Sequence, residues 1–243
     1  MSRLEAFAIE GVPEIRPGDD LADVLGAHDY EAGDVLVVAH KVVSKAEGAL
    51  RRLDDVAPTA QADRLAREHG KDPRHLQVVL DESQAIVRAQ RGVLICRTHH
   101  GFVCANAGVD ASNAPADGTV VTLPRDPDAS ARALRARFRN RPAVVVADSF
   151  GRAWRRGQCD VAIGIAGLTA IDDWRGRTDA TGHELRATAI AIADEAAAAA
   201  DLVRDKASRE PAVVVRGLQR FVTDDDGPGA RTLVRQIAED LFT

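Results

Sequence analysis

The sequence predicts an α+β fold built around a mixed β-sheet. Short runs rich in Val and Ile, each bounded by Gly, Pro or Asp, are typical of buried strands. Helical patterns lie between some of these runs, but strands and helices alternate only partly, and the strand-like runs near residues 85–104 follow one another as in a hairpin. A doubly wound parallel sheet requires regular alternation, so a mixed sheet is the better prediction.

Seven strands are expected, each a short apolar run between turn-forming residues. Their ranges are 4–9, 34–39, 85–89, 93–97, 143–147, 160–165 and 212–215. Five helices are expected from apolar residues that recur at helical spacing. Their ranges are 60–69, 73–80, 129–138, 184–202 and 230–241. The first helix has the clearest ends, because Thr59 is a suitable N-cap and Gly70 a usual C-terminal stop.

The 243 residues are enough for one large domain or for two intimate subdomains. No repeat of fixed period and no Ser/Gly linker divides the chain, so we expect one domain over residues 1–243. The loops at 113–128 and 167–183 are the expected seams between subdomains. Both are rich in Asp, Gly, Thr and Arg, and ordered loops of this length often carry function.

Composition argues against several classes of protein. The net charge is -5 and charges of both signs are interspersed, whereas nucleic-acid binders usually carry a basic surplus. The chain shows neither an apolar run near 18 residues nor an apolar N-terminal segment, so we expect no membrane insertion and a cytoplasmic location. Cys96, Cys104 and Cys159 form no CxxC pair, which argues against a disulfide framework and a zinc site.

Residues 37–48 form the first segment that contains candidate functional residues. A strand of buried character ends there and is followed by His40, Lys41, Ser44 and Lys45. Ligands of open sheets bind at strand ends, and a lysine can meet a phosphate as a point charge. A solvated turn is the alternative interpretation of this segment.

Residues 101–113 form the second segment, which has small residues, dense turn chemistry and a single carboxylate, Asp110. Small residues allow the backbone to approach a ligand closely, and the carboxylate of Asp110 is suited to binding a cation. The alternative is an Asx-turn, in which the Asp side chain binds its own backbone.

Residues 144–152 form the third segment, in which a hydrophobic strand leads into Asp148 and Ser149 and then into several arginines. Carboxylate and hydroxyl oxygens are hard ligands of the kind that Mg²⁺ and Mn²⁺ prefer. Arginines can hold phosphates or carboxylates in bidentate fashion. The alternative is that Asp148 caps a following helix.

In combination these segments resemble the coenzyme F420-0:L-glutamate ligase family, the γ-glutamyl ligases that build the glutamate tail of that deazaflavin. The resemblance extends over roughly residues 8–220, with the blocks in order. The matching blocks are 11–20, 41–48, 100–113, 126–130, 148–152, 157–158, 160–164 and 214–218. It implies an α+β, mixed-sheet fold with two intimate subdomains and an intertwined homodimer.

The resemblance also implies a GTP-dependent ligase that uses two divalent ions, Mn²⁺ or Mg²⁺, together with K⁺. The metal ligands that it implies are Asp110, Asp148 and Ser149: the two aspartates share the first ion, and Ser149 and the Lys206 region lie near the second. The catalytic residues that it implies are Asp110, Asp148 and Lys45. The residues that it implies for GTP binding are Gly11, Val12, Pro13, Glu14, His40, Lys41, Lys45, Asn113 and Lys206.

The implied reaction joins L-glutamate to F420-0, or to its dehydro form, through an acyl phosphate made with GTP. Two other interpretations stay open at this point. One is a metal- and nucleotide-dependent ligase or phosphotransferase that acts on a different small carboxylic acid. The other is a nucleotide-binding homologue without turnover.

Overall fold

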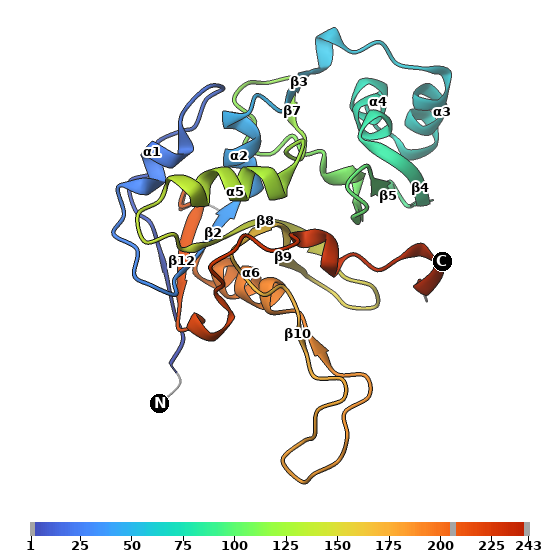
Figure 1. The fold of residues 1–243 in the computed structure, drawn as a ribbon. Helices are drawn as coiled ribbons and strands as arrows, with labels where there is room; N and C mark the ends of the chain where they lie inside the picture. Colours follow the sequence, from blue (N-terminus) through green and yellow to red (C-terminus); the bar gives the residue numbers. More distant parts are fainter. Residues whose placement is uncertain (1–2, 205–207, 241–243) are drawn as a thin grey trace.

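The computed structural model describes residues 3–204 and 208–240. Its main sheet has five strands in the order β1-β12-β2-β8-β9 (Figure 1). The strands are β1 (Glu5–Ala8), β2 (Val35–Ala39), β8 (Ala143–Gly151), β9 (Gln158–Ala166) and β12 (Ala212–Arg216). The β2–β8 pair is parallel and the other three pairs are antiparallel. This arrangement confirms the predicted α+β class with a mixed sheet.

Helices cover both faces of this sheet (Figure 1). Strand residues alternate between faces, so Leu36 and Val38 point to one core and Val35 and Val37 to the other. The first core is closed by α1 (Leu21–Gly26), α2 (His40–Ala46) and α5 (Pro127–Arg137). The second is closed by α6 (Ile192–Val203), whose small alanines let it pack closely on the strands.

A third core cluster contains no residue of the five-stranded sheet. It is built around α3 (Ala60–His69) and α4 (Pro73–Asp81), which pack against a three-stranded sheet. That sheet consists of β4 (Ser83–Gln90), β5 (Val93–Thr98) and β6 (Val103–Ala105). β3 (Leu50–Arg52), which follows α2 in the chain, pairs with β7 (Thr119–Val121), and Val120 of β7 belongs to the third core cluster.

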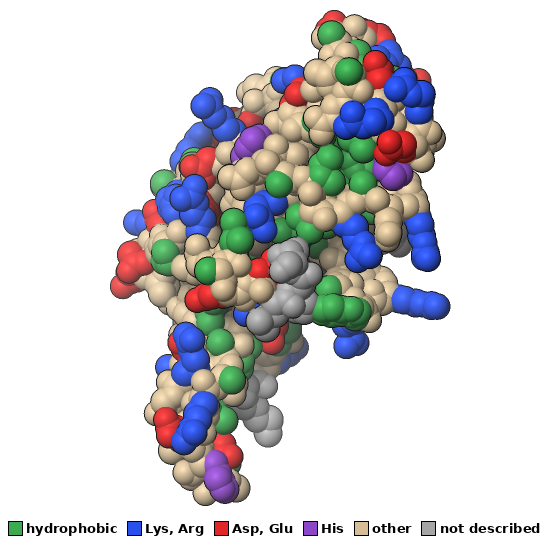
Figure 2. Space-filling view, turned by 90° about the vertical axis from the view of Figure 1, so that its right-hand side faces the viewer, with side chains coloured by type: hydrophobic (Ala, Val, Ile, Leu, Met, Phe, Trp, Pro, Cys, Tyr) green, Lys and Arg blue, Asp and Glu red, His purple; other side chains and the backbone are tan. Residues whose placement is uncertain are grey.

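A narrow arm projects from the body where β10 (Asp172–Asp173) pairs with β11 (Ala189–Ile190) (Figure 1). Figure 2 shows the arm as an extension at the bottom of the molecule that carries side chains of both charges. Over residues 3–204 and 208–240, no helix combines the length and the apolar character needed to cross a membrane.

Two predicted helices differ from the structure. The helix expected at 184–202 begins only at Ile192, because the residues before it belong to the arm and β11 is extended. In place of the helix expected at 230–241, the described residues form two 3₁₀ turns, Ala230–Leu233 and Ile237–Glu239. Within residues 230–240 only Ala230 is buried, so this segment lacks the apolar stripe that stabilises a helix.

The sequence did not predict helices α1 and α2 or the short strands β3, β6, β7, β10 and β11, and α2 matters most for the site. It occupies residues for which a strand end and a turn were the expectations. Its seven residues include two adjacent valines and it has no side-chain N-cap, so intrinsic propensity is weak. Burial of Val43 in the first core, where α2 packs on β2 and β8, stabilises the helix instead.

Candidate functional site

The candidate site lies at one edge of the five-stranded sheet, where β1 and β2 end and β12 and β9 begin. In the parallel pair, Ala39 of β2 lies opposite Ala147 of β8. The next residue of each strand is therefore delivered to the same edge. His40 opens α2 there, and its Nε2 lies 3.2 Å from Oδ1 of Asp148. The imidazole is buried, and its Nδ1 lies 3.4 Å from the Ser44 hydroxyl.

The adjacent residue of α2 holds the second predicted carboxylate. Lys41 Nζ donates to Asp110 Oδ2 at 2.6 Å and to the Ser112 hydroxyl at 2.6 Å. Asp110 also accepts from the Ser112 amide at 2.7 Å, so the Asx-turn considered as an alternative is present alongside the ion pair. Asp110 and Asp148, 38 residues apart in the sequence, thus both contact the first turn of α2.

The second lysine of α2 faces the segment that follows β1. Lys45 Nζ donates to Glu14 Oε1 at 2.6 Å, and the lysine side chain is only 7% exposed while that of Glu14 is 64% exposed. Gly11 begins this segment with φ +75°, a conformation that disfavours residues with a Cβ. The predicted lysine and the predicted 11–14 segment are therefore in contact.

Asp148 and Ser149 lie on opposite faces of β8. The strand does not end at Ala147 as expected but continues to Gly151, so Asp148 caps no helix. Strand alternation turns Asp148 toward α2 and Ser149 toward the face covered by α6. The Ser149 hydroxyl donates to Asp160 Oδ1 at 2.6 Å, and the other carboxylate oxygen of Asp160 accepts from Arg204.

Electrostatics at this edge follow from burial and close charges. Burial raises the pKa of Asp110, but hydrogen bonds from Lys41 and Ser112 outweigh it and hold that pKa below its ordinary value. Burial raises the pKa of the Cys104 thiol to about 12, and the Asp148 carboxylate adds to the increase. Asp110 is therefore an anion at neutral pH, and Cys104 is an inert thiol.

Some expected residues stand apart from these contacts. Asn113 is exposed in the loop after Asp110, with φ +56°. Lys206 belongs to residues 205–207, which lie outside the described part of the chain. Asp160 and Arg204 were not selected from the sequence. A charged residue next to the apolar run 161–166 was the available signal for Asp160, but nothing local pointed to Arg204 as its partner.

Comparison with known proteins decides the family. The model of the F420-0:gamma-glutamyl ligase family matches residues 11–217. The chain belongs to this family. Coenzyme F420:L-glutamate ligase of Methanopyrus kandleri is 45% identical over 252 residues, covering 100% of both chains. The protein of that name from Methanothermobacter thermautotrophicus is 40% identical and covers 98% of both, and that from Archaeoglobus fulgidus is 44% identical over 89% of this chain and 88% of its own.

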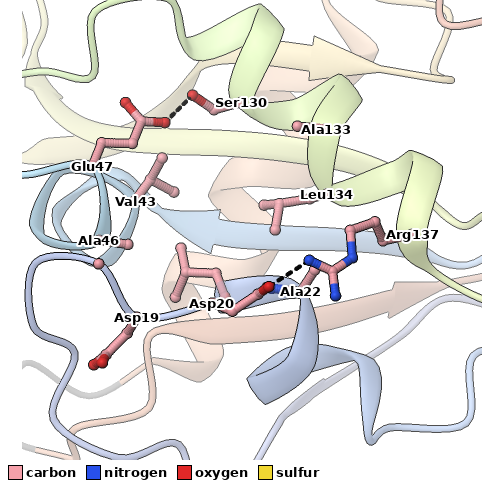
Figure 3. Close-up of a pocket in the computed structure, with 12 residues that line it drawn as sticks. Asp19, Asp20, Ala22, Val43, Ala46, Glu47, Ser130, Ala133, Leu134 and Arg137 are labelled. Atoms are coloured by element: carbon pink, nitrogen blue, oxygen red, sulfur yellow. Dashed lines mark hydrogen bonds and ion pairs between the residues drawn. The ribbon is translucent and has the colours of Figure 1, made fainter.

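Two cavities clarify where this F420-0:gamma-glutamyl ligase family member can hold a ligand. One, of about 320 Å³, is lined by Gly11 and Val12 together with His28, so it adjoins the segment expected to bind GTP. Another of about 320 Å³ lies between α1, α2 and α5 (Figure 3). Arg137 pairs with Asp20 across its mouth, and none of the predicted site residues lines it.

Asp110 and Asp148 offer carboxylate oxygens of the kind that Mg²⁺ and Mn²⁺ prefer, and both contact the first turn of α2. Ser149 offers a hydroxyl oxygen on the opposite face of β8. Among residues 3–204 and 208–240, no three His, Cys, Asp or Glu side chains come together as a metal cage. Mg²⁺ in nucleotide-dependent enzymes commonly takes one or two carboxylates and completes its shell with phosphates and water.

Proposed function

We propose that this chain is a GTP-dependent ligase that joins L-glutamate to coenzyme F420-0 through an amide bond. The observation that carries the proposal is the family match over residues 11–217. Relatives that cover the whole chain are named for ligation of L-glutamate to coenzyme F420. The dependence on GTP and the acyl-phosphate route come from the family resemblance, and the lysines and carboxylates at the sheet edge are compatible with both.

Three basic side chains of α2 lie at the edge proposed for the triphosphate, and each is paired with a carboxylate in the structure. Lys45 is nearly buried, and its partner Glu14 is largely exposed, so the Glu14 side chain can swing outward and yield its place to a phosphate oxygen. Lys41 and His40 follow β2 directly and reach the same edge. Point charges and imidazole N–H groups at this position neutralise phosphate oxygens.

The two carboxylates contacted by α2 supply the ligands for a divalent cation. Lys41 pairs with Asp110 in the structure, so a divalent cation held by this carboxylate would compete with the Lys41 ammonium. The released ammonium would then be available to phosphate oxygens at the same edge. A bound Mn²⁺ or Mg²⁺ supplies Lewis-acid polarisation of phosphoryl oxygens. A second divalent ion near Ser149 and a K⁺ ion are parts of the same proposal.

The reaction itself needs an activated acid. The terminal carboxylate of F420-0 attacks the γ-phosphorus of GTP, which forms an acyl phosphate and releases GDP. The amine of L-glutamate attacks the acyl carbon and loses a proton, and inorganic phosphate leaves with the former carboxylate oxygen. Substrates that held both reactants close and displaced water from this edge would protect the acyl phosphate from hydrolysis.

The proposal includes a homodimer. The β10–β11 arm extends away from the body, and a two-stranded ribbon of this kind is marginally stable in water without a packing partner. A second copy of the chain is a suitable partner for it.

The test is a reaction of purified protein with GTP, Mn²⁺, F420-0 and L-glutamate, followed by mass spectrometry and by GDP measurement. We expect F420-0 to gain the mass of one glutamate residue for each GDP released. Reactions that lack glutamate or F420-0 serve as controls. GDP release with other acids but no product from F420-0 would assign a different substrate, and absence of both products would contradict the proposal.

A further inference from the structure

A buried acidic residue outside the predicted set sits beside the predicted metal ligands. Asp160 is 2% exposed and lies on β9, directly opposite Ser149 of β8. Its Oδ1 accepts from the Ser149 hydroxyl at 2.6 Å. Its Oδ2 accepts from Arg204, whose side chain is 10% exposed. Ionised groups this deeply buried are retained only with matched partners, and both carboxylate oxygens have one.

The bond to Asp160 fixes the direction of the Ser149 hydroxyl. A hydroxyl has one proton to donate, and an ionised carboxylate can only accept. With its proton directed at Asp160, the Ser149 oxygen can act toward any other group only as an acceptor. That is the orientation which a cation ligand needs, whereas an outward-pointing proton would repel a cation.

Arg204 also makes a hydrogen bond to the residue that precedes β12. It is the C-cap of α6, and its Nη1 donates to the carbonyl of Pro211, next to the start of β12, at 3.4 Å. The Arg204 guanidinium, at the end of α6, thus contacts both Asp160 and Pro211, the residue before β12. Burial lowers the pKa of Arg204, and the Asp148 carboxylate opposes that change, so Arg204 also lies within the field of the predicted metal ligand.

We propose that Asp160 is a positioning residue that orients the Ser149 hydroxyl for a divalent cation, and that its pairing with Arg204 keeps the carboxylate in place. The inference rests on the proposed function for the presence of that cation. Asp160 acts through Ser149 and is not itself a ligand, because its carboxylate is buried between Ser149 and Arg204, whereas the side chain of Asp110 is 45% exposed. Hydrogen-bond partners behind metal ligands typically change metal affinity 10- to 100-fold when they are removed.

The test is a double-mutant cycle read by Mn²⁺ binding to the full chain in the presence of GDP, with free Mn²⁺ measured by electron paramagnetic resonance. Asp160→Asn keeps the shape but can donate to Ser149 and turn its proton outward. We expect Asp160→Asn to weaken Mn²⁺ binding about tenfold when Ser149 is present. In a Ser149→Ala background the same change should have less than a twofold effect.

Asp194→Asn is the matched control. Asp194 is another partly buried carboxylate, on α6, that accepts a hydrogen bond from the Ala162 amide of β9 at 2.9 Å. Its replacement should leave Mn²⁺ affinity unchanged. If Asp160→Asn does not fold, the test is a comparison of the Mn²⁺ affinities of Ser149→Thr and Ser149→Ala. Threonine keeps the hydroxyl that donates to Asp160 and should keep wild-type affinity, while alanine should lose about tenfold.

Several outcomes would overturn the inference. These are unchanged Mn²⁺ binding in Asp160→Asn, an equal loss in both Ser149 backgrounds, equal affinity of the threonine and alanine variants, or no Mn²⁺ binding by the wild-type protein. Product formation from F420-0 by the wild-type protein is measured separately. Coupled Mn²⁺ binding without that product would sink the proposed substrate and leave the role of Asp160 standing.

Discussion

Removal of the Asp148 charge should abolish activity without unfolding the protein. Asp148 Oδ1 accepts from the Ser149 amide at 2.8 Å and lies 3.2 Å from His40 Nε2. Asp148→Asn keeps an oxygen for both contacts, so we expect the free energy of unfolding to change by less than about 1 kcal/mol. Asp148→Ala loses both contacts, and an expected loss of about 1.5–3 kcal/mol makes the asparagine variant the cleaner probe.

The activity of the same variants separates function from stability. Loss of one preorganised electrostatic contact to the transition state typically lowers kcat about 100- to 1,000-fold, and we expect that range for Asp148→Asn. The assay is glutamylated product by mass spectrometry, with urea unfolding of each variant as the stability measurement. Product formation by Asp148→Asn within a few-fold of wild type would refute the assignment of Asp148 as a metal ligand.

Four further predictions follow from particular contacts. Lys45→Met should raise the KM for GTP at least tenfold with a folded protein, and an unchanged KM would remove Lys45 from the phosphate site. The pKa of Asp110 is lowered in the folded state, so the ionised carboxylate contributes stability above the ordinary value of 3.8, and this contribution is lost as the pH falls through the folded-state pKa. In urea unfolding measured from pH 6 to pH 2.5, the wild type should therefore lose its stability advantage over Asp110→Asn. Cys104 should resist maleimide at pH 8 in the folded protein while the less buried Cys159 reacts, and mass spectrometry of peptides would reveal the reverse. Gly164→Ala should destabilise the protein by about 1–3 kcal/mol in urea unfolding, because its Cβ would lie 2.3 Å from the Pro127 carbonyl oxygen, and unchanged stability would show that α5 can shift away from β9.

The sequence could predict the strands that have an apolar run. The runs 34–39 and 143–147 mark the buried parts of β2 and β8, but the polar end of β8 and the short strands β3, β6, β7, β10 and β11 have no such run. Asp110, Asp148 and Lys45 could also be selected from the sequence, because each is a charged residue within a few positions of an apolar run.

The partners of these residues could not be predicted from local patterns. Lys41 and Asp110 are separated by 69 residues, and Ser149 meets Asp160 only because β8 and β9 pair in one particular register. Helix α2 is stabilised by packing on the sheet and not by its own propensity, so its residues were taken for a turn. Packing between residues far apart in the sequence therefore determined these contacts and the helical state of α2.

The central claim is that Asp110 and Asp148 bind one divalent cation together with the nucleotide. The direct measurement is anomalous diffraction at the manganese edge from crystals grown with Mn²⁺ and GDP. The account predicts an anomalous peak about 2.0–2.3 Å from a carboxylate oxygen of each aspartate, with the Lys41 ammonium moved away from Asp110. A peak that contacts neither carboxylate, or only one of them, would contradict it.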